Sequence, residues 1–279
     1  MTTAIVLGGG GSLGAFSVGV ARWLLVDKGI RPDIVTGTST GALAAVLVAS
    51  GEVSLLSDLY TNVSTRDVLH QSFLGDLDVV LHGYTNSVEP LQNLIDEYLT
   101  EERRQRILDR GVKLQIAALN LQKGVVEYAG AGSNLERLKK FVLASSCQPA
   151  LMPTIEIDGY DYVDGGVMQM VPVQRAVDIG ATKIYAVATS AAPADRPPIS
   201  RRFPNSPGTD VFNYTLRRAI LLMTDQLTDD MIALQLERGV DITAIRPART
   251  QTPDPLEFAP SEMAAMMDAG YLRARQLLP

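Results

Sequence analysis

The feature that most constrains the fold is a strand, glycine loop and helix unit that occurs twice in the first fifty residues. A short apolar run, 3–7, ends at four consecutive glycines, and segment 15–28 then has the apolar spacing of a helix that ends at Gly29. A second run, 33–36, leads through further glycines into an apolar helix expected at 42–50. Strands that alternate with helices in this way are typical of a parallel sheet covered by helices on both faces.

The rest of the chain continues this alternation. Further strands are expected at 113–119, 125–129, 183–189 and 241–245, with a hairpin at 154–163 that turns at Asp158-Gly159. Further helices are expected at 91–108, 134–145, 173–179, 211–238 and 261–278. Residues 53–110 fit the sheet less well, and their weakly patterned part, 72–88, suggests a cap or lid. The sequence predicts one α/β domain over 1–279, with a mainly parallel sheet and a cap inserted at about 53–110.

Composition excludes several classes of protein. The chain is 46% hydrophobic and 20% charged, which favours a buried core over disorder. A net charge of −6, with no Lys and Arg cluster interleaved with aromatics, predicts no nucleic-acid partner. The single cysteine, Cys147, excludes an internal disulfide framework and fits a reducing compartment. Without a secretory signal or an apolar run of about 20 residues, we expect a cytoplasmic protein whose membrane contacts are peripheral.

The segment Gly37-Thr38-Ser39-Thr40-Gly41 fits the pattern G-x-S-x-G where the second strand passes into a helix. A sharp turn there lifts the serine hydroxyl above the sheet edge, and the flanking glycines avoid clashes with neighbouring backbone. The N-terminus of the following helix points its amides and positive dipole end at the same place. This context predicts that Ser39 is a nucleophile.

A nucleophilic serine needs a base, and this chain offers few. Its two histidines, His70 and His82, come early, whereas the histidine of an α/β-hydrolase follows the acid late in the chain. The alternative is Asp164, which ends a strand-like run and precedes Gly165 and Gly166. These glycines let the backbone turn sharply and let another segment approach. An aspartate is a weak base, but it can serve if burial raises its pKa and it lies within about 3 Å of the hydroxyl.

The glycine run at 8–14 has two interpretations. Gly9, Gly11 and Gly14 fit the dinucleotide-binding pattern G-x-G-x-x-G. That motif requires an acidic residue at the end of the second strand, whereas Asp33 begins its strand. The other use of such a run is an oxyanion hole, because consecutive amides without side chains can bind the charge that develops on a carbonyl oxygen.

In this order, the glycine run, the G-x-S-x-G motif and the segment 164–166 resemble the patatin-like phospholipase family. The text at 145–153 and at 171–173 is also similar to family sequence, and the resemblance covers about residues 4–190. It implies a three-layer α/β/α core and hydrolysis of acyl esters in lipids, commonly phospholipids or lysophospholipids. No metal or other cofactor is expected, since His, Cys and carboxylates show no ligand spacing.

The resemblance also implies the roles of individual residues. Ser39 would be the nucleophile and Asp164 its only catalytic partner, a general base. The oxyanion hole would consist of the amides of Gly9, Gly10 and Gly11. The chain departs from many members at Leu13, where they carry Arg or Lys, and this weakens the assignment of a phospholipid substrate more than that of hydrolysis.

Two alternatives from other classes stay open. One is a nucleotide-binding oxidoreductase that uses Gly9 to Gly14, and the other is a non-catalytic lipid-binding or scaffold protein. The second would use the apolar stripe of helix 211–238, which we instead expect to be core: Leu216, Ile220, Met223, Leu227, Met231 and Leu234. Candidates for accepting an acyl chain lie in the cap: Phe73, Leu74, Leu77, Val79, Val80 and Leu81. The oligomeric state is open, with a homodimer as one option.

Overall fold

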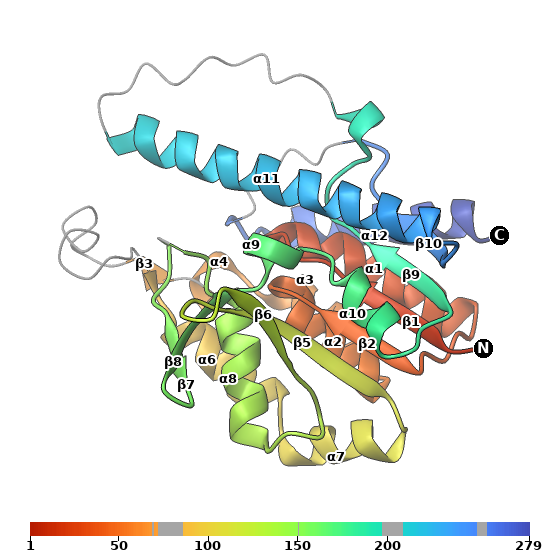
Figure 1. Cartoon of the computed structure of the whole chain (residues 1–279), viewed down its shortest axis with the longest axis horizontal. Coiled ribbons are helices and arrows are strands. Elements are labelled where there is room, and N and C mark those ends of the chain that lie inside the picture. Colours follow the sequence, from red (N-terminus) through yellow and green to blue (C-terminus); the bar gives the residue numbers. More distant parts are fainter. Residues whose placement is uncertain (69, 72–85, 150, 197–208, 250–255) are drawn as a thin grey trace.

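A mixed eight-stranded sheet forms the centre of the protein (Figure 1). The computed structural model describes residues 1–68, 70–71, 86–149, 151–196, 209–249 and 256–279. The strand order is β10-β9-β1-β2-β5-β8-β7, with β6 also paired to β5. The strands are β1 (Thr3–Leu7), β2 (Ile34–Gly37), β5 (Lys113–Asn120), β6 (Val125–Ala129), β7 (Ile155–Ile157), β8 (Tyr160–Asp164), β9 (Lys183–Val187) and β10 (Asp241–Ile245). A separate two-stranded pair is formed by β3 (His70–Gln71) and β4 (Asn86–Ser87).

The strand directions confirm the mainly parallel sheet. All neighbours from β10 to β5 in this order run parallel. The antiparallel pairs lie at the other side of the sheet, where β5 pairs with β6 and β8, and β8 pairs with β7. The hairpin of β7 and β8 has the expected turn, since Asp158 and Gly159 both have positive φ angles, 52° and 78°.

Helices cover both faces of the sheet, as expected for three layers. They are α1 (Ala15–Arg22), α2 (Thr40–Ser50), α3 (Val53–Asn62), α4 (Thr65–Val68), α6 (Glu89–Tyr98), α7 (Glu101–Asp109), α8 (Leu135–Ser146), α9 (Gly166–Gln169), α10 (Val173–Asp178), α11 (Thr209–Glu237) and α12 (Pro260–Leu277). Alternate residues of a strand point to opposite faces. Accordingly, Ile5 and Leu7 of β1 belong to the larger core, with α1, α2, α8 and α12, whereas Ala4 and Val6 belong to a smaller core with α10 and α11.

Two predicted helices differ from the observed ones. The helix expected at 91–108 is two helices, α6 and α7, because Thr100 caps a new helix by accepting a hydrogen bond from the amide of Arg103. The helix expected at 15–28 is α1 followed by a π-helical turn, Trp23–Asp27.

Within its described residues, the segment predicted to hold a cap contributes the helices α3, α4, α6 and α7. Leu56, Ile95 and Ile107 from these helices are buried in the larger core, so they are integral to the domain. A cap within this segment stays a prediction, because residues 72–85 of the proposed lid, which include His82 and the acyl-chain candidates, lie outside the described residues.

The stripe of α11 that we expected to be core is largely exposed. The exposed fraction is 62% for Met223, 43% for Leu227 and 39% for Leu234, so the prediction is wrong for these residues. Ile220 and Met231 are partly buried, and the side chain of Leu216 lies outside the described part. No helix within the described ranges combines the length and the apolar character needed to cross a bilayer.

The first and last helices of the chain pack backbone against backbone. A Cβ atom at Gly19 of α1 would lie 1.8 Å from the carbonyl oxygen of Met267, and one at Gly270 of α12 would lie 2.0 Å from that of Phe16. Both distances are far below van der Waals contact. The two glycines are therefore what allows α12 to cover α1.

Replacing Gly19 by alanine should destabilise the fold by about 1–3 kcal/mol or more, because the added methyl group must push the two helix backbones apart. Urea unfolding measures the change. Gly132→Ala is the matched control, since no atom lies within 4 Å of its added Cβ and its φ is not positive. Equal unfolding midpoints for the two variants would contradict this packing.

Candidate active site

Ser39 lies in a sharp turn between β2 and α2. Its φ and ψ angles are 55° and −131°, a conformation that residues other than glycine rarely adopt. Such strained positions persist only where the surrounding structure holds them, and they are frequent at active sites. The turn places Ser39 at the N-terminus of α2, directly beyond the carboxyl end of β2.

The glycines beside Ser39 are required by close backbone approaches. A Cβ atom at Gly37 would lie 2.2 Å from the carbonyl oxygen of Gly41, and one at Gly41 would lie 2.4 Å from that of Leu7. The turn is also held from its side, because the hydroxyl of Thr38 donates to the carbonyl oxygen of Gln169 at 3.0 Å. The G-x-S-x-G spacing therefore reflects a turn that only glycines can fill.

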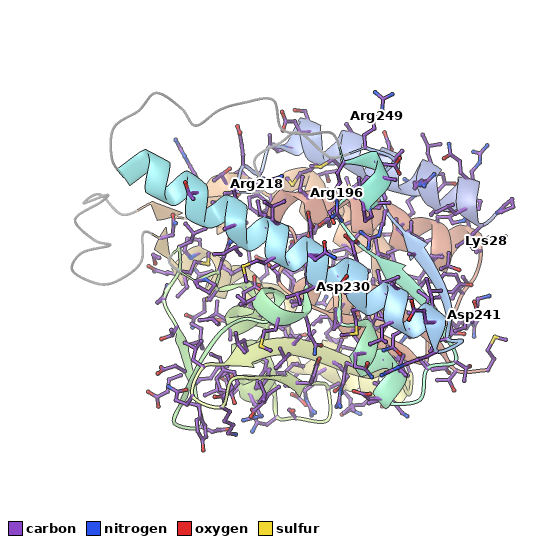
Figure 2. All side chains as sticks on the ribbon, turned by 45° about the horizontal axis from the view of Figure 1, so that its top comes forward. Lys28, Arg196, Arg218, Asp230, Asp241 and Arg249 are labelled. Atoms are coloured by element: carbon purple, nitrogen blue, oxygen red, sulfur yellow. The ribbon has the colours of Figure 1, made fainter. Side chains whose placement is uncertain are left out.

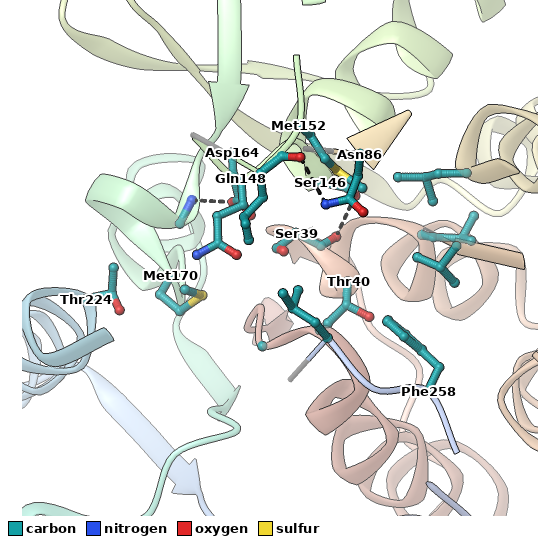
Figure 3. A pocket seen from close by; sticks show the side chains of 18 of the residues that line it. Ser39, Thr40, Asn86, Ser146, Gln148, Met152, Asp164, Met170, Thr224 and Phe258 are labelled. Carbon is teal, nitrogen blue, oxygen red and sulfur yellow. Dashed lines mark hydrogen bonds between the residues drawn. The ribbon is translucent and has the colours of Figure 1, made fainter. Parts of the chain in front are cut away.

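Two serines at the end of α8, of which Figure 3 labels Ser146, hold the backbone of Ser39. The amide of Ser39 donates to the hydroxyl oxygen of Ser145 at 2.9 Å. The hydroxyl of Ser146 lies 3.4 Å from the carbonyl oxygen of Ser39 and also donates to Val142 of its own helix at 3.1 Å. Ser145 is fully buried, so its hydroxyl is shielded from water. Sequence analysis noted this segment only as family-like text and assigned it no role.

Asp164 is the last residue of β8, and it lines the same pocket as Ser39. Its Oδ1 atom also accepts a hydrogen bond from the amide of Gly166 at 2.7 Å. The side chain is buried, with 6% of the residue exposed. Burial raises the pKa of Asp164 from 3.8 to about 7, against the smaller opposing effects of the hydrogen bonds from Gly166 and Ser39.

The sheet explains how two residues so far apart in the sequence meet. Gly37 at the end of β2 is level with Ile116 of β5, and Asp164 at the end of β8 is level with Ala118 of the same strand. The ends of β2 and β8 thus flank one short piece of β5. Gly165 permits this approach, because a Cβ atom there would lie 2.7 Å from the carbonyl oxygen of Ala117.

The glycine loop after β1 forms another wall of the site. The amide of Gly9 donates to the carbonyl oxygen of Met170 at 3.1 Å, and the hydroxyl of Thr189 donates to the carbonyl oxygen of Gly9 at 2.6 Å. Gly10 and Gly11 have positive φ angles of 142° and 57°, and they are the two loop glycines that line the pocket with Ser39.

Asp33, the acid considered for a dinucleotide site, is used elsewhere. Its Oδ2 atom accepts a hydrogen bond from the amide of Thr3 at 2.7 Å, at the start of β1. The glycine loop follows the other end of that strand, so this carboxylate does not approach the loop. The geometry disfavours the nucleotide-binding alternative.

Ser39 and Asp164 open into a pocket of about 1180 Å³, including its open mouth (Figure 3). Most of its wall is apolar, including Leu43, Leu59, Leu91, Met152, Met170 and Phe258. The side chain of Gln148 projects into it beside Asp164 and Met170 (Figure 3). An apolar pocket with a few convergent polar groups at one place suits a ligand with a hydrocarbon chain and one polar functional group.

Several pocket residues were missed by sequence analysis because they come from distant segments. The hydroxyl of Thr40 pairs with that of Tyr60 in α3, whose pKa burial raises to about 12. Phe258 comes from the segment before α12, and Ile220 and Leu221 come from α11. Among the described residues, no group of three or more His, Cys, Asp or Glu side chains is placed to bind a metal ion.

The fold and the site together define an α/β protein with an apolar pocket, lined by a strained serine and a buried carboxyl group. The family model described as patatin-like phospholipase matches residues 5–177. The chain belongs to the patatin-like phospholipase family, which confirms the family inferred from the three motifs. Its members are lipolytic ester hydrolases, the class of enzyme that the sequence predicts.

Curated relatives match the same part of the chain. The lysophospholipase nte1 of Neurospora crassa is 27% identical over 187 residues, which are 67% of this chain and 12% of the relative. The lysophospholipase NTE1 of Kluyveromyces lactis is 28% identical over 199 residues, which are 70% of this chain and 13% of the relative. The chain thus spans about an eighth of the length of these relatives.

A solved structure supports the fold. VipD from Legionella pneumophila matches 99% of this chain and 66% of its own, with a TM-score of 0.50 and 15% sequence identity. At this identity the likeness concerns the arrangement of strands and helices alone.

Ser145→Ala should destabilise the fold by about 1–3 kcal/mol, because it leaves the amide of Ser39 buried without its acceptor. Urea unfolding measures the change. The matched control is Ser17→Ala, which removes a buried hydroxyl that has no hydrogen-bond partner among the described residues and should be nearly neutral. A Ser145→Ala variant as stable as the control would show that this hydrogen bond does not hold the turn.

Proposed function

We propose that the protein hydrolyses carboxylic esters of lipids, as a phospholipase A or lysophospholipase, with Ser39 as nucleophile and Asp164 as its only catalytic partner. The observation that carries the proposal is that a strained serine, Ser39, and a buried carboxyl group, Asp164, line the same apolar pocket. The names of the curated relatives, lysophospholipases, support lipids with a single acyl chain among the substrates.

In the first half of the reaction, Asp164 takes the proton of the Ser39 hydroxyl while the oxygen attacks the carbonyl carbon of the ester. The tetrahedral intermediate then collapses, and Asp164 returns the proton to the leaving alcohol. In the second half, Asp164 takes a proton from water, which attacks the acyl-enzyme. Collapse releases the carboxylic acid and restores the Ser39 hydroxyl.

The negative charge on the substrate oxygen requires hydrogen-bond donors. We assign this role to the amides of Gly10 and Gly11, because Gly9, the third predicted donor, already donates to Met170. Thr189 supports the loop through its hydrogen bond to the carbonyl oxygen of Gly9. The N-terminus of α2 adds a positive dipole end at Ser39.

We place this reaction in the cytoplasm, at a lipid surface that the protein contacts peripherally. Nucleic acid is not among the proposed partners, in keeping with the net charge of −6. A homodimer stays a prediction.

Ser39→Ala should abolish labelling by a fluorophosphonate, because the probe reacts with the activated hydroxyl. Asp164→Asn should slow both labelling and ester hydrolysis by about a thousandfold or more, since the amide cannot accept the proton. A panel of p-nitrophenyl esters and lysophospholipids, run beside Ser17→Ala as a control, measures both effects. Labelling that persists in Ser39→Ala would refute the assignment of the nucleophile.

The pH dependence of hydrolysis should follow the carboxyl group of Asp164. Its pKa is about 7, and only the ionised form accepts a proton, so kcat/KM should rise about tenfold per pH unit below 7 and level off above it. The measurement is a pH profile with a neutral, soluble ester. A profile that levels off already near pH 4 would show that Asp164 has an unperturbed pKa or is not the base.

A further inference from the structure

The long helix α11 turns several polar side chains toward the protein, beside Ile232 of the smaller core. Thr224, Thr228 and Gln235 face inward and are buried, with 2%, 4% and 0% of their surface exposed. The described residues on the outside include large apolar side chains: Leu222, Met223, Leu227, Leu234 and Leu236. A helix that stabilises a water-soluble core normally has the opposite orientation.

Polar contacts beneath α11 fix this orientation. Asp229 pairs with both Arg196 and Arg246 at 2.8 Å, and Arg246 is itself buried, with 8% exposed. Further along the helix, Gln235 donates to Gln174 of α10 at 2.6 Å. Rotating the helix to bury its leucines would break these contacts and leave buried charges unpaired. The apolar face is therefore held outward by the fold.

The first half of this face is continuous with the pocket. Ile220 and Leu221 line the pocket, and the next two residues, Leu222 and Met223, are exposed by 50% and 62%. One turn of helix thus joins the pocket wall to the outer surface. In the second half of α11 the exposed residues include Asp230, which Figure 2 labels on this helix, and Glu237.

We propose that the first half of this outer face docks on the surface of a zwitterionic lipid bilayer or micelle. We call it the rim face and define it by Ala219, Leu222, Met223 and Leu227. An acyl chain leaving the lipid would pass along Ile220 and Leu221 toward Ser39. The proposal rests on the proposed function, because it supplies the route by which a lipid ester reaches that pocket.

Two observations select this partner. The net charge is −6, so an anionic surface would repel the protein as a whole. The helix α11 itself carries both signs, with Arg217 and Arg218 as well as Asp225 and Asp230, so a zwitterionic surface offers apolar contact without that cost. A second copy of the chain seated on the rim face would cover the surface that adjoins the pocket wall. With a lipid surface as the partner, the continuity between the rim face and the pocket gives an acyl chain a path from the lipid to Ser39.

The test uses the full chain with Ser39→Ala, which leaves the lipid intact, and sucrose-loaded phosphatidylcholine vesicles that sediment with bound protein. Adding Leu222→Gln and Met223→Gln should weaken binding by about tenfold or more, because two apolar side chains no longer enter the interface. Glutamine keeps the helix propensity, and circular dichroism checks the fold.

The matched control adds Leu234→Gln and Leu236→Gln, which change exposed leucines of the same helix, 39% and 49% exposed, about 20 Å from Leu222 and Met223. These changes should weaken binding less than twofold. Equal loss in both variants, or no sedimentation of the Ser39→Ala protein, would overturn the proposal. So would self-association that depends on Leu222 and Met223 in a protein that does not bind vesicles.

A separate measurement distinguishes failure of the proposed function from failure of the rim-face proposal. If the wild-type protein neither hydrolyses soluble esters nor reacts with a fluorophosphonate, the proposed function fails. Vesicle binding that depends on Leu222 and Met223 would still support the rim face as a lipid-docking surface. If esters are hydrolysed but binding does not depend on these residues, the function stands and the rim face is rejected.

Discussion

The site depends on one physical circumstance: the carboxyl group of Asp164 is removed from water in the same pocket that Ser39 lines. In water an aspartate is too weak a base to activate an alcohol. Burial at the end of β8 raises its pKa to about 7, and the mechanism we propose therefore needs no histidine. The strand order and the glycine spacing bring these two groups to one site that is shielded from water.

Holding this arrangement has an energetic cost. A pKa raised from 3.8 to about 7 means that ionised Asp164 destabilises the fold, by an amount on the order of 4 kcal/mol. Because the folded-state pKa is the higher one, this loss grows as the pH rises from about 4 to 7. Ser39 adds the strain of its positive φ, which the hydrogen bond from its amide to Ser145 helps to offset. The site is therefore a region where stability is given up for reactivity.

The sequence predicts the parts of this structure that depend on local patterns. The strands, the turn at Ser39 and the hairpin at Asp158-Gly159 follow from apolar periodicity and from glycines at fixed positions. The catalytic role of Asp164 stays a prediction made by elimination, because Asp164 is a carboxylate followed by two glycines in a chain without a suitably placed histidine. The spacing of the glycine run, the G-x-S-x-G motif and the segment 164–166 does not by itself predict that they form one site. That prediction came from the resemblance to a family.

The remaining features depend on contacts between distant segments. The amide of Gly9 donates a hydrogen bond to the carbonyl oxygen of Met170, and the amide of Ser39 donates to the hydroxyl of Ser145. The carboxylate of Asp33 accepts a hydrogen bond at the start of β1. No local sequence pattern predicts any of these hydrogen bonds. The helix α11 was misjudged for a related reason: its apolar stripe has the spacing of a core face, but the ion pairs of Asp229 turn that stripe outward.

The most direct test of the central claim is a titration of the Asp164 carboxyl group by nuclear magnetic resonance. The protein would be labelled with carboxyl-¹³C aspartate, and Asp164→Asn would identify the signal. The account predicts a midpoint near pH 7, which moves higher in Ser39→Ala because the hydrogen bond from Ser39 lowers the pKa. A midpoint near pH 4 that does not respond to Ser39→Ala would contradict it.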